Sequence, residues 1–111
     1  MEMIEESQGK TIVVTVKGRL DSNMSKSFET RLLELSSSPA ASLVIDLGQV
    51  SYVSSAGLRV LLLSVRKVKA AKGKVALCAI QAPVKEVFDI SGLSAVFSIH
   101  PTRDAAVQSV A

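Results

Sequence analysis

The sequence predicts an α/β fold: a single domain over residues 1–111 with a mixed, mostly parallel central sheet of four to five strands and about four helices. Two observations predict it. Runs rich in β-branched or apolar residues alternate along the chain with segments whose apolar residues recur at helical spacing. Because strands that alternate with helices require crossover connections, neighbouring strands are expected to run parallel. A chain of 111 residues can bury one core and needs no second domain.

The first half of the chain contains the clearest strand patterns. Residues 10–18 are rich in β-branched residues and end in glycine, and a short segment near residues 3–4 is expected to pair with them. Residues 42–47 form an apolar run without alternation, which is typical of a central strand covered on both faces. Gly48-Gln49 is expected to break this run before a second apolar piece at residues 50–53.

Two helices are predicted between and after these strands. The first is expected to start after Asp21 or Ser22, one of which serves as its N-cap, and to end at residues 36–39. Its apolar positions are Met24, Phe28, Leu32, Leu33 and Leu35. The second helix is expected over residues 56–72, and Gly73 is expected to take the left-handed conformation that often follows a helix.

Helical phase divides the second helix into two faces. The predicted core face holds Leu58, Leu61, Leu62 and Val65. The opposite face holds Val60, Leu63 and Lys67, with Arg59 and Arg66 beside them. The two apolar residues on this basic outer face are either ordinary exposed aliphatics or part of a partner-binding patch, and the sequence leaves both interpretations open.

The last third of the chain continues the alternation of strand and helix. Residues 74–80 predict a buried strand, and Pro83 marks the start of a helix with an apolar face. Residues 95–99 predict a last short strand, and Thr102 is expected to cap a final helix over residues 103–110.

The junction between residues 50–53 and the second helix contains two adjacent serines, Ser54 and Ser55. At a helix N-terminus the first backbone N–H groups lack intrahelical partners, and the helix dipole presents partial positive charge. The fold therefore tolerates a phosphate on a serine here, while the surface changes its character. The alternative is that Ser54 only caps the helix and Ser55 only fills its first turn. Asp21 and Asp46 are expected at strand ends on the same edge of the sheet, as binding groups or as caps.

Composition argues against several classes of protein. The net charge is only +3, and the six basic residues between positions 59 and 74 have no aromatic side chain among them for base stacking, so a solvated helix face is favoured over nucleic-acid binding. The single Cys78 and single His100 exclude an internal disulfide and a clustered metal site. No apolar run approaches the roughly 20 residues that span a bilayer, so a cytoplasmic protein without membrane insertion is expected.

The sequence contains only weak matches to known catalytic motifs. A serine nucleophile needs an adjacent base, and His100 lies far along the chain. Ser64 and Lys67 match S-x-x-K within a helix, but its partner motifs are missing, and the sequence has no glycine-rich phosphate-binding loop. We therefore expect no enzymatic activity and no cofactor.

Four short motifs occur in order along the chain: Gly18-Arg19-Leu20-Asp21, Ile45-Asp46-Leu47, Ser54-Ser55-Ala56-Gly57-Leu58 and Gly73-Lys74-Val75. With the order of the elements, they make the chain resemble a STAS domain of the anti-sigma-factor antagonist family. The resemblance implies a partner-switching phosphoprotein that acts in signal transduction and transcription regulation. The resemblance also implies that the unphosphorylated form binds an anti-sigma factor that is also a serine kinase. It further implies that phosphorylation releases this form and that a serine phosphatase of the metal-dependent type reverses the modification.

By position, the resemblance makes Ser55 the phosphorylated residue and brings Asp21 near the partner surface. The family often has aspartate at the position of Ser54, which leaves Ser54 as a second candidate acceptor. The expected partner-binding residues are Asp21, Ser54, Ser55, Ala56, Gly57, Arg59, Val60 and Leu63. The alternative function is a non-phosphorylated STAS subunit of a lipid or anion transport complex, and a third, an enzyme with Ser55 as nucleophile, lacks a base. The partner's identity stays open, and the free protein is expected to be a monomer.

Overall fold

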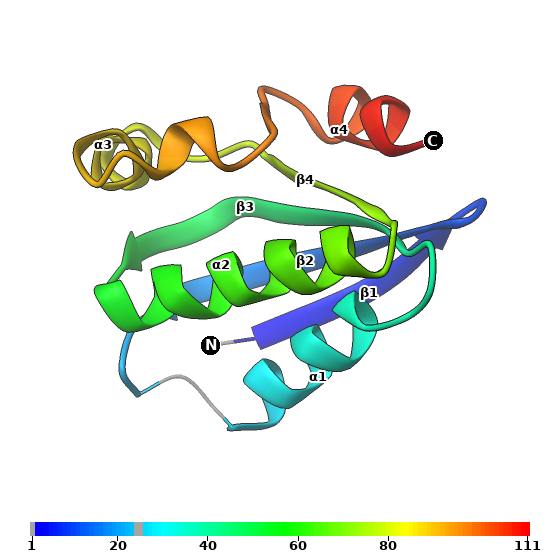
Figure 1. Cartoon of the computed structure of the whole chain (residues 1–111). Helices are drawn as coiled ribbons and strands as arrows, with labels where there is room; N and C mark the ends of the chain where they lie inside the picture. Colours follow the sequence, from blue (N-terminus) through cyan, green and yellow to red (C-terminus); the bar gives the residue numbers. More distant parts are fainter. Residues whose placement is uncertain (1, 24–25) are drawn as a thin grey trace.

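The computed structural model describes residues 2–23 and 26–111. The described elements are, in chain order, β1 (Glu2–Gln8), β2 (Thr11–Leu20), α1 (Lys26–Ser36), β3 (Ser42–Val53), α2 (Ser55–Ala70), β4 (Lys74–Cys78), α3 (Ala82–Ile90), the 3-10 helix η1 (Leu93–Ala95), β5 (Ile99–His100) and α4 (Arg103–Val110). The described strands form one sheet in the order β1-β2-β3-β4-β5, in which β1 and β2 are antiparallel and the later pairs are parallel (Figure 1). The predicted fold class is confirmed.

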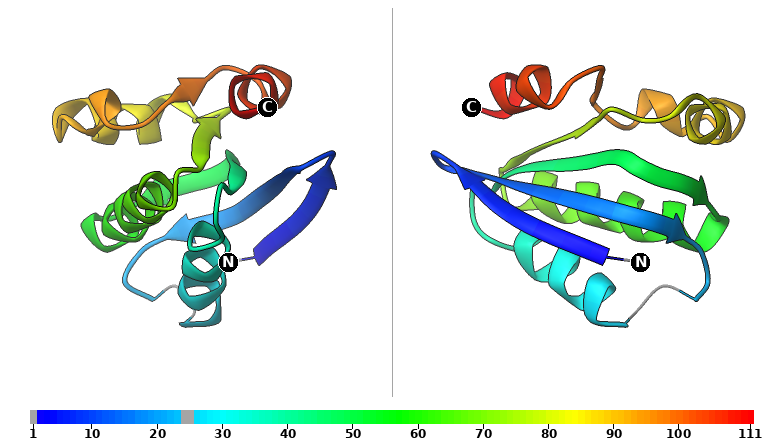
Figure 2. Two further views of the ribbon diagram at one scale, coloured as in Figure 1. Left: turned by 45° about the vertical axis from the view of Figure 1, so that its right-hand side comes forward. Right: turned by 180° about the vertical axis from the view of Figure 1, so that it is seen from behind.

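Two hydrophobic layers lie on opposite faces of the sheet. The neighbouring residues Val13 and Val14 belong to different layers, because successive side chains of a strand point to opposite faces. The larger layer includes the apolar faces of α1 and α2, and Figure 2 shows α2 behind β1, β2 and β3 when the molecule is seen from the back. The smaller layer lies under α4 and consists of Val13, Val44, Ala76, Cys78, Ala106 and Val110. The central strand β3 is therefore covered on both faces, as its apolar run predicts.

Strand β3 continues through Gly48-Gln49, so the predicted break is wrong. Its pairing with β2 shifts between Thr15↔Asp46 and Lys17↔Gln49, where β3 contains one residue more than β2. The pairing shifts again before Arg19↔Tyr52. Extra residues of this kind bend a strand without ending it. The glycine therefore marks a bulge inside one long strand, which leads directly to Ser54.

Several element ends also differ from the prediction. Residues 21–23 form a turn and α1 begins at Lys26, so neither Asp21 nor Ser22 is its N-cap, and the predicted helical position Met24 lies outside the described residues. Strand β4 ends at Cys78, before Ala79 at φ +60°. The last strand is β5 (Ile99–His100) rather than residues 95–99, and η1 includes Ala95, the first residue of the predicted strand. The cap of α4 is confirmed, since the backbone N–H of Ala105 donates to the Thr102 hydroxyl at 3.1 Å.

The turn after α2 requires glycine at position 73 because the neighbouring backbone leaves no space for a side chain. Lys72 is the left-handed residue of this turn, with φ +62°, so the predicted role of Gly73 is wrong. A Cβ atom on Gly73 would lie 2.4 Å from the carbonyl oxygen of Ala41. The same oxygen accepts a hydrogen bond from the backbone N–H of Lys74 at 2.7 Å. The loop before β3 thus approaches the turn too closely for any side chain.

The buried face of α2 is wider than its helical phase predicts. Val60 is only 2% exposed, so its expected position on the outer face is wrong, and Leu62, expected in the core, is only partly buried. Helix α2 contacts α1 as well as strands β2, β3 and β4, so more than one of its faces is covered. The buried residues of α2 are Gly57, Leu58, Val60, Leu61, Ser64, Val65 and Val68.

Candidate functional site

The two serines hold different positions at the start of α2. Ser54 is the N-cap: its backbone is extended, at φ −95° and ψ 174°, and its hydroxyl accepts a hydrogen bond from the backbone N–H of Gly57 at 3.3 Å. Its own backbone N–H donates to the carbonyl oxygen of Leu20 at 2.8 Å. Ser55 is the first helical residue, and its side chain is exposed. The cap is therefore made by Ser54, and the exposed hydroxyl of the pair is that of Ser55.

Gly57 fixes the start of α2 against the end of β2. A Cβ atom at this position would lie 2.5 Å from the carbonyl oxygen of Leu20 and 2.9 Å from the Leu20 Cβ. Only glycine allows this approach, and Gly57 is itself buried. Gly57 therefore positions Ser55 at the edge of the sheet and offers no surface to a partner.

Asp21 lies beside the serines, as the sequence predicts. It directly follows Leu20, the last residue of β2, which pairs with Val53 of β3. One carboxylate oxygen of Asp21 accepts the backbone N–H of Asn23 at 3.0 Å, and the other accepts from Nε of Arg19 at 3.3 Å. The turn after β2 is thus held by the Asp21 side chain, which remains partly exposed.

Arg19 and Tyr52 complete this edge, and the sequence reasoning did not select either of them. The two residues are paired in the β2–β3 register, and the guanidinium carbon of Arg19 lies 4.2 Å from the centre of the Tyr52 ring. Tyr52 is 41% exposed, which is unusual for a large apolar side chain in this protein. The signals available in the sequence were the position of Arg19 in a quoted motif and the single tyrosine two residues before Ser54.

Asp46 does not join this edge. It lies within β3 rather than at its end, and its carboxylate accepts hydrogen bonds from Nε and Nη2 of Arg103 at 3.1 and 3.0 Å. Nη2 of Arg103 also donates to the Thr15 hydroxyl at 2.8 Å. The Asp46 side chain is 14% exposed. The prediction that Asp46 is a strand-end group near the serines is wrong, and its carboxylate instead attaches α4 to the sheet.

Cys78 lies beneath this pair and is fully buried. Burial, reinforced by the negative charge of Asp46, raises the pKa of the Cys78 thiol to about 11. A thiol in this state is a poor nucleophile at neutral pH. Among the described residues no group of three histidine, cysteine, aspartate or glutamate side chains could hold a metal ion. The same residues include no helix with the length and apolar character to cross a membrane.

The exposed surface of α2 is cationic. Arg59, Arg66 and Lys69 are exposed, and no ion pair of these three is found within residues 2–23 and 26–111. The sequence between Asp46 and Glu86 contains no acidic residue that could neutralise them. Leu63 lies among these cations and is partly exposed. A stripe with unpaired positive charges therefore runs along α2 from Ser55.

The fold and this edge describe an α/β domain with an exposed serine at a helix start and a surface suited to protein contacts. The family model of the STAS domain matches residues 3–106, and the chain belongs to the STAS domain family. The sequence is 34% identical over 95 residues to BtrV of Bordetella bronchiseptica, whose name assigns it provisionally to the anti-sigma factor antagonists. That alignment covers 86% of this chain and 82% of BtrV.

Solved structures with the same fold carry related names. The crystal structure of an anti-sigma factor antagonist from Mycobacterium paratuberculosis matches with a TM-score of 0.85 and 28% identity, covering 98% of this chain and 92% of that one. The phosphorylated form of SpoIIAA, a Bacillus cell fate determinant, matches with a TM-score of 0.74 and 20% identity, covering 99% of this chain and all of that one (100%). At 20% identity, the similarity to SpoIIAA shows a shared fold and nothing further.

Proposed function

We propose that this protein is an anti-sigma factor antagonist and acts as a binding protein rather than an enzyme. Its unphosphorylated form binds an anti-sigma factor that is also a serine kinase, and phosphorylation of Ser55 releases it. The names of BtrV and of the Mycobacterium protein support the class. The exposure of Ser55 at the first position of α2, beside an exposed edge of the sheet, is the observation that carries the switch.

The geometry of the cap favours Ser55 over Ser54 as the acceptor. The Ser54 hydroxyl already accepts the Gly57 N–H, so a phosphate on Ser54 would disturb the cap that holds the first turn. A phosphate on Ser55 leaves that hydrogen bond in place. It adds roughly −1.5 to −2 charges where the helix dipole tolerates them. The fold is therefore expected to survive modification of Ser55, and a partner docked at this edge would meet a hydrated dianion.

The proposed docking surface consists of Asp21, Ser54, Ser55, Ala56, Arg59 and Leu63. Val60 and Gly57 are excluded from it because they are buried. Arg59 and Leu63 stand one and two helical turns beyond Ser55, so a partner that covers Ser55 can contact both. A serine phosphatase of the metal-dependent type would remove the phosphate and restore binding.

The test is a pull-down from native lysate with wild type, Ser55→Ala and Ser55→Asp as baits, followed by mass spectrometry of prey and bait. Ser7→Asp, on the exposed edge strand β1, is the matched control for added charge. The expected result is a kinase-like partner with wild type, Ser55→Ala and Ser7→Asp but not with Ser55→Asp, and phosphate mapped to Ser55. Recovery of the same transporter subunits by all four baits, without phosphate, would favour the transport alternative and refute the switch.

A second variant tests the helix part of the surface. Leu63→Glu places a negative charge on the partly exposed face of α2 without touching Ser55. We expect it to fold normally and to lose the partner that wild type captures, because it removes an apolar contact and neutralises part of the positive charge along α2. If the folded variant binds that partner with unchanged affinity, α2 is not part of the docking surface.

A further inference from the structure

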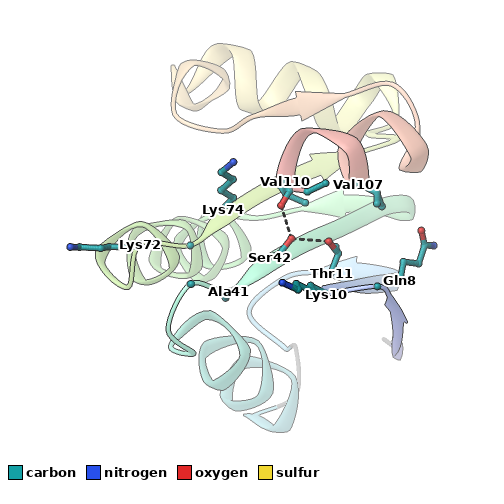
Figure 3. Close-up of a pocket in the computed structure, with 13 residues that line it drawn as sticks. Gln8, Lys10, Thr11, Ala41, Ser42, Lys72, Lys74, Val107 and Val110 are labelled. Carbon is teal, nitrogen blue, oxygen red and sulfur yellow. Dashed lines mark hydrogen bonds between the residues drawn. The ribbon is translucent and has the colours of Figure 1, made fainter.

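A cavity of about 510 Å³ lies at the edge of the sheet opposite to Ser55. It is bounded by the turn between β1 and β2, the loop before β3, the turn before β4 and the end of α4 (Figure 3). Ser42 and Lys74 begin their strands here, whereas Ser55 follows the end of β3. The volume falls within the range of roughly 300–1,000 Å³ that is common for small-molecule sites. This cavity is therefore separate from the proposed docking surface.

The charged side chains that line the cavity are all cationic, and Gln8, Thr11 and Ser42 are its neutral polar side chains. Lys10, Lys72 and Lys74 line it, and no aspartate or glutamate does. Within the described part of the chain, none of the three ammonium groups is found in an ion pair. In Figure 3, Lys10 and Lys74 stand on either side of the Thr11, Ser42 and Val110 hydrogen bonds, while Lys72 points away from them. Lys10 and Lys74 are therefore the groups available to an anion.

The hydroxyl groups in the floor of the cavity have no hydrogen left to donate. Ser42 Oγ donates to the carbonyl oxygen of Val110 at 2.8 Å. Because this uses the only hydroxyl hydrogen of Ser42, the 2.7 Å bond between Thr11 and Ser42 has Thr11 as its donor. The walls beside these groups include Val107, Val110 and Ala41. A sugar or a nucleobase would find few hydrogen-bond donors there. An aliphatic chain needs none, so it would leave no polar group unpaired.

The backbone around the cavity is held in an uncommon conformation. Gly9, Ala40 and Lys72 have φ values of +64°, +52° and +62°, and two of them carry side chains that rarely adopt this region. The backbone N–H of Ala40 donates to the carbonyl oxygen of Ala71 at 2.9 Å, which ties the two turns together. Strained residues fixed in this way are frequent at ligand sites. The backbone turns that bound the cavity are therefore fixed by the fold, while long exposed side chains such as Lys10 and Lys74 form its rim.

We propose that this cavity binds an amphipathic anion: an unbranched aliphatic chain that ends in a carboxylate or a phosphate monoester. The chain lies against Val107 and Val110, and the charged end is held at the rim by Lys10 and Lys74. Removal of the chain from water supplies the affinity, and the two ammonium groups select a negative end. Such a molecule can come from two sources, a free amphiphile or the headgroup region of an anionic lipid.

The first test is an NMR titration of the whole chain with sodium decanoate and decyl phosphate, both below their micelle concentrations, with decanol and inorganic phosphate as comparison ligands. We expect saturable shifts at residues 40–42, 72–74 and 107–110 with the two amphipathic anions. Decanol and phosphate should each bind at least about tenfold more weakly, since each lacks one of the two interactions. Equal binding of decanol, shifts that do not saturate, or shifts centred on residues 54–66 would overturn the proposal.

The charge requirement has a matched control. The double variant Lys10→Gln/Lys74→Gln should weaken decanoate binding about fivefold, a loss typical of two exposed ion pairs. Lys17→Gln/Lys69→Gln removes two exposed lysines away from the cavity and should bind as wild type. If both double variants bind alike, Lys10 and Lys74 do not hold the anion and the proposal fails.

A vesicle experiment then identifies the source of the ligand. Wild type and both double variants are sedimented with phosphatidylcholine vesicles that do or do not contain phosphatidylglycerol. Binding that needs both the anionic lipid and the Lys10–Lys74 pair assigns the site to a lipid. Decanoate binding without vesicle binding assigns it to a free amphiphile. Absence of both refutes the site.

Discussion

Replacing Gly57 with alanine tests how the start of α2 is held at the sheet. The added Cβ would lie 2.5 Å from the carbonyl oxygen of Leu20 and 2.9 Å from its Cβ. The first obstacle is backbone, which no rotamer change can relieve, so α2 must move away by about 1 Å to reach an ordinary contact distance. Ser54 must move with it, although its N–H is bonded to the same Leu20 oxygen at 2.8 Å.

Two opposing effects set the magnitude. Overpacking of a close contact costs about 1–3 kcal/mol, and the strained Ser54–Leu20 hydrogen bond adds to this cost. Alanine has a higher helix propensity than glycine, which offsets up to about 1 kcal/mol of this destabilisation. We therefore expect the free energy of unfolding to fall by about 1–2 kcal/mol, with a decrease in Tm of about 4–8 °C.

The assay is urea unfolding followed by circular dichroism, together with binding of the partner recovered with wild type. Ala70→Gly is the comparison variant, because it lowers helix propensity at the far, exposed end of α2, outside the docking surface and without crowding. Partner affinity should fall in Gly57→Ala more than in Ala70→Gly, since only the first displaces Ser55. A Gly57→Ala protein as stable as wild type, or more stable, would refute the steric argument.

Three further predictions concern other parts of the molecule. Asp46→Ala should lower the free energy of unfolding by about 1–3 kcal/mol in urea titrations, because it leaves the Arg103 guanidinium half-buried without its carboxylate; a loss below about 0.5 kcal/mol would contradict that role. The hydrogen bond from Arg31 lowers the pKa of Glu5, so the stabilisation is present at neutral pH and is lost as pH falls through the folded-state pKa. The stability gap between wild type and Glu5→Gln should therefore close below about pH 4, and a gap that persists at pH 2 would exclude this pair as its source. With a pKa of about 11, Cys78 should resist iodoacetamide at pH 8 until urea unfolds the chain, and labelling in native buffer as fast as that of free cysteine would contradict its burial.

The local pattern of the sequence determined the order of the elements and the position of the serines. Alternating strand and helix patterns depend on neighbouring residues, and the parallel sheet follows because crossovers are required between such strands. The motif around Ser54 and Ser55 likewise predicts a strand that leads into a helix, and Thr102 caps α4 through a bond to a residue only three positions away. These features can be predicted from the sequence because they depend on interactions between residues that are close together along the chain.

Tertiary contacts decided the features that the sequence reasoning placed incorrectly. Val60 is buried on a helix that contacts α1 as well as the sheet, and helical phase alone does not indicate the second contact. Asp46 lies away from the serine edge because β3 continues to Val53, and its carboxylate is bound from α4 by Arg103, 57 positions along the chain. Gly73 serves a close approach of Ala41, and the left-handed residue falls on Lys72 instead. In each case the partner is distant in sequence, and its position is set only when the sheet and helices are packed.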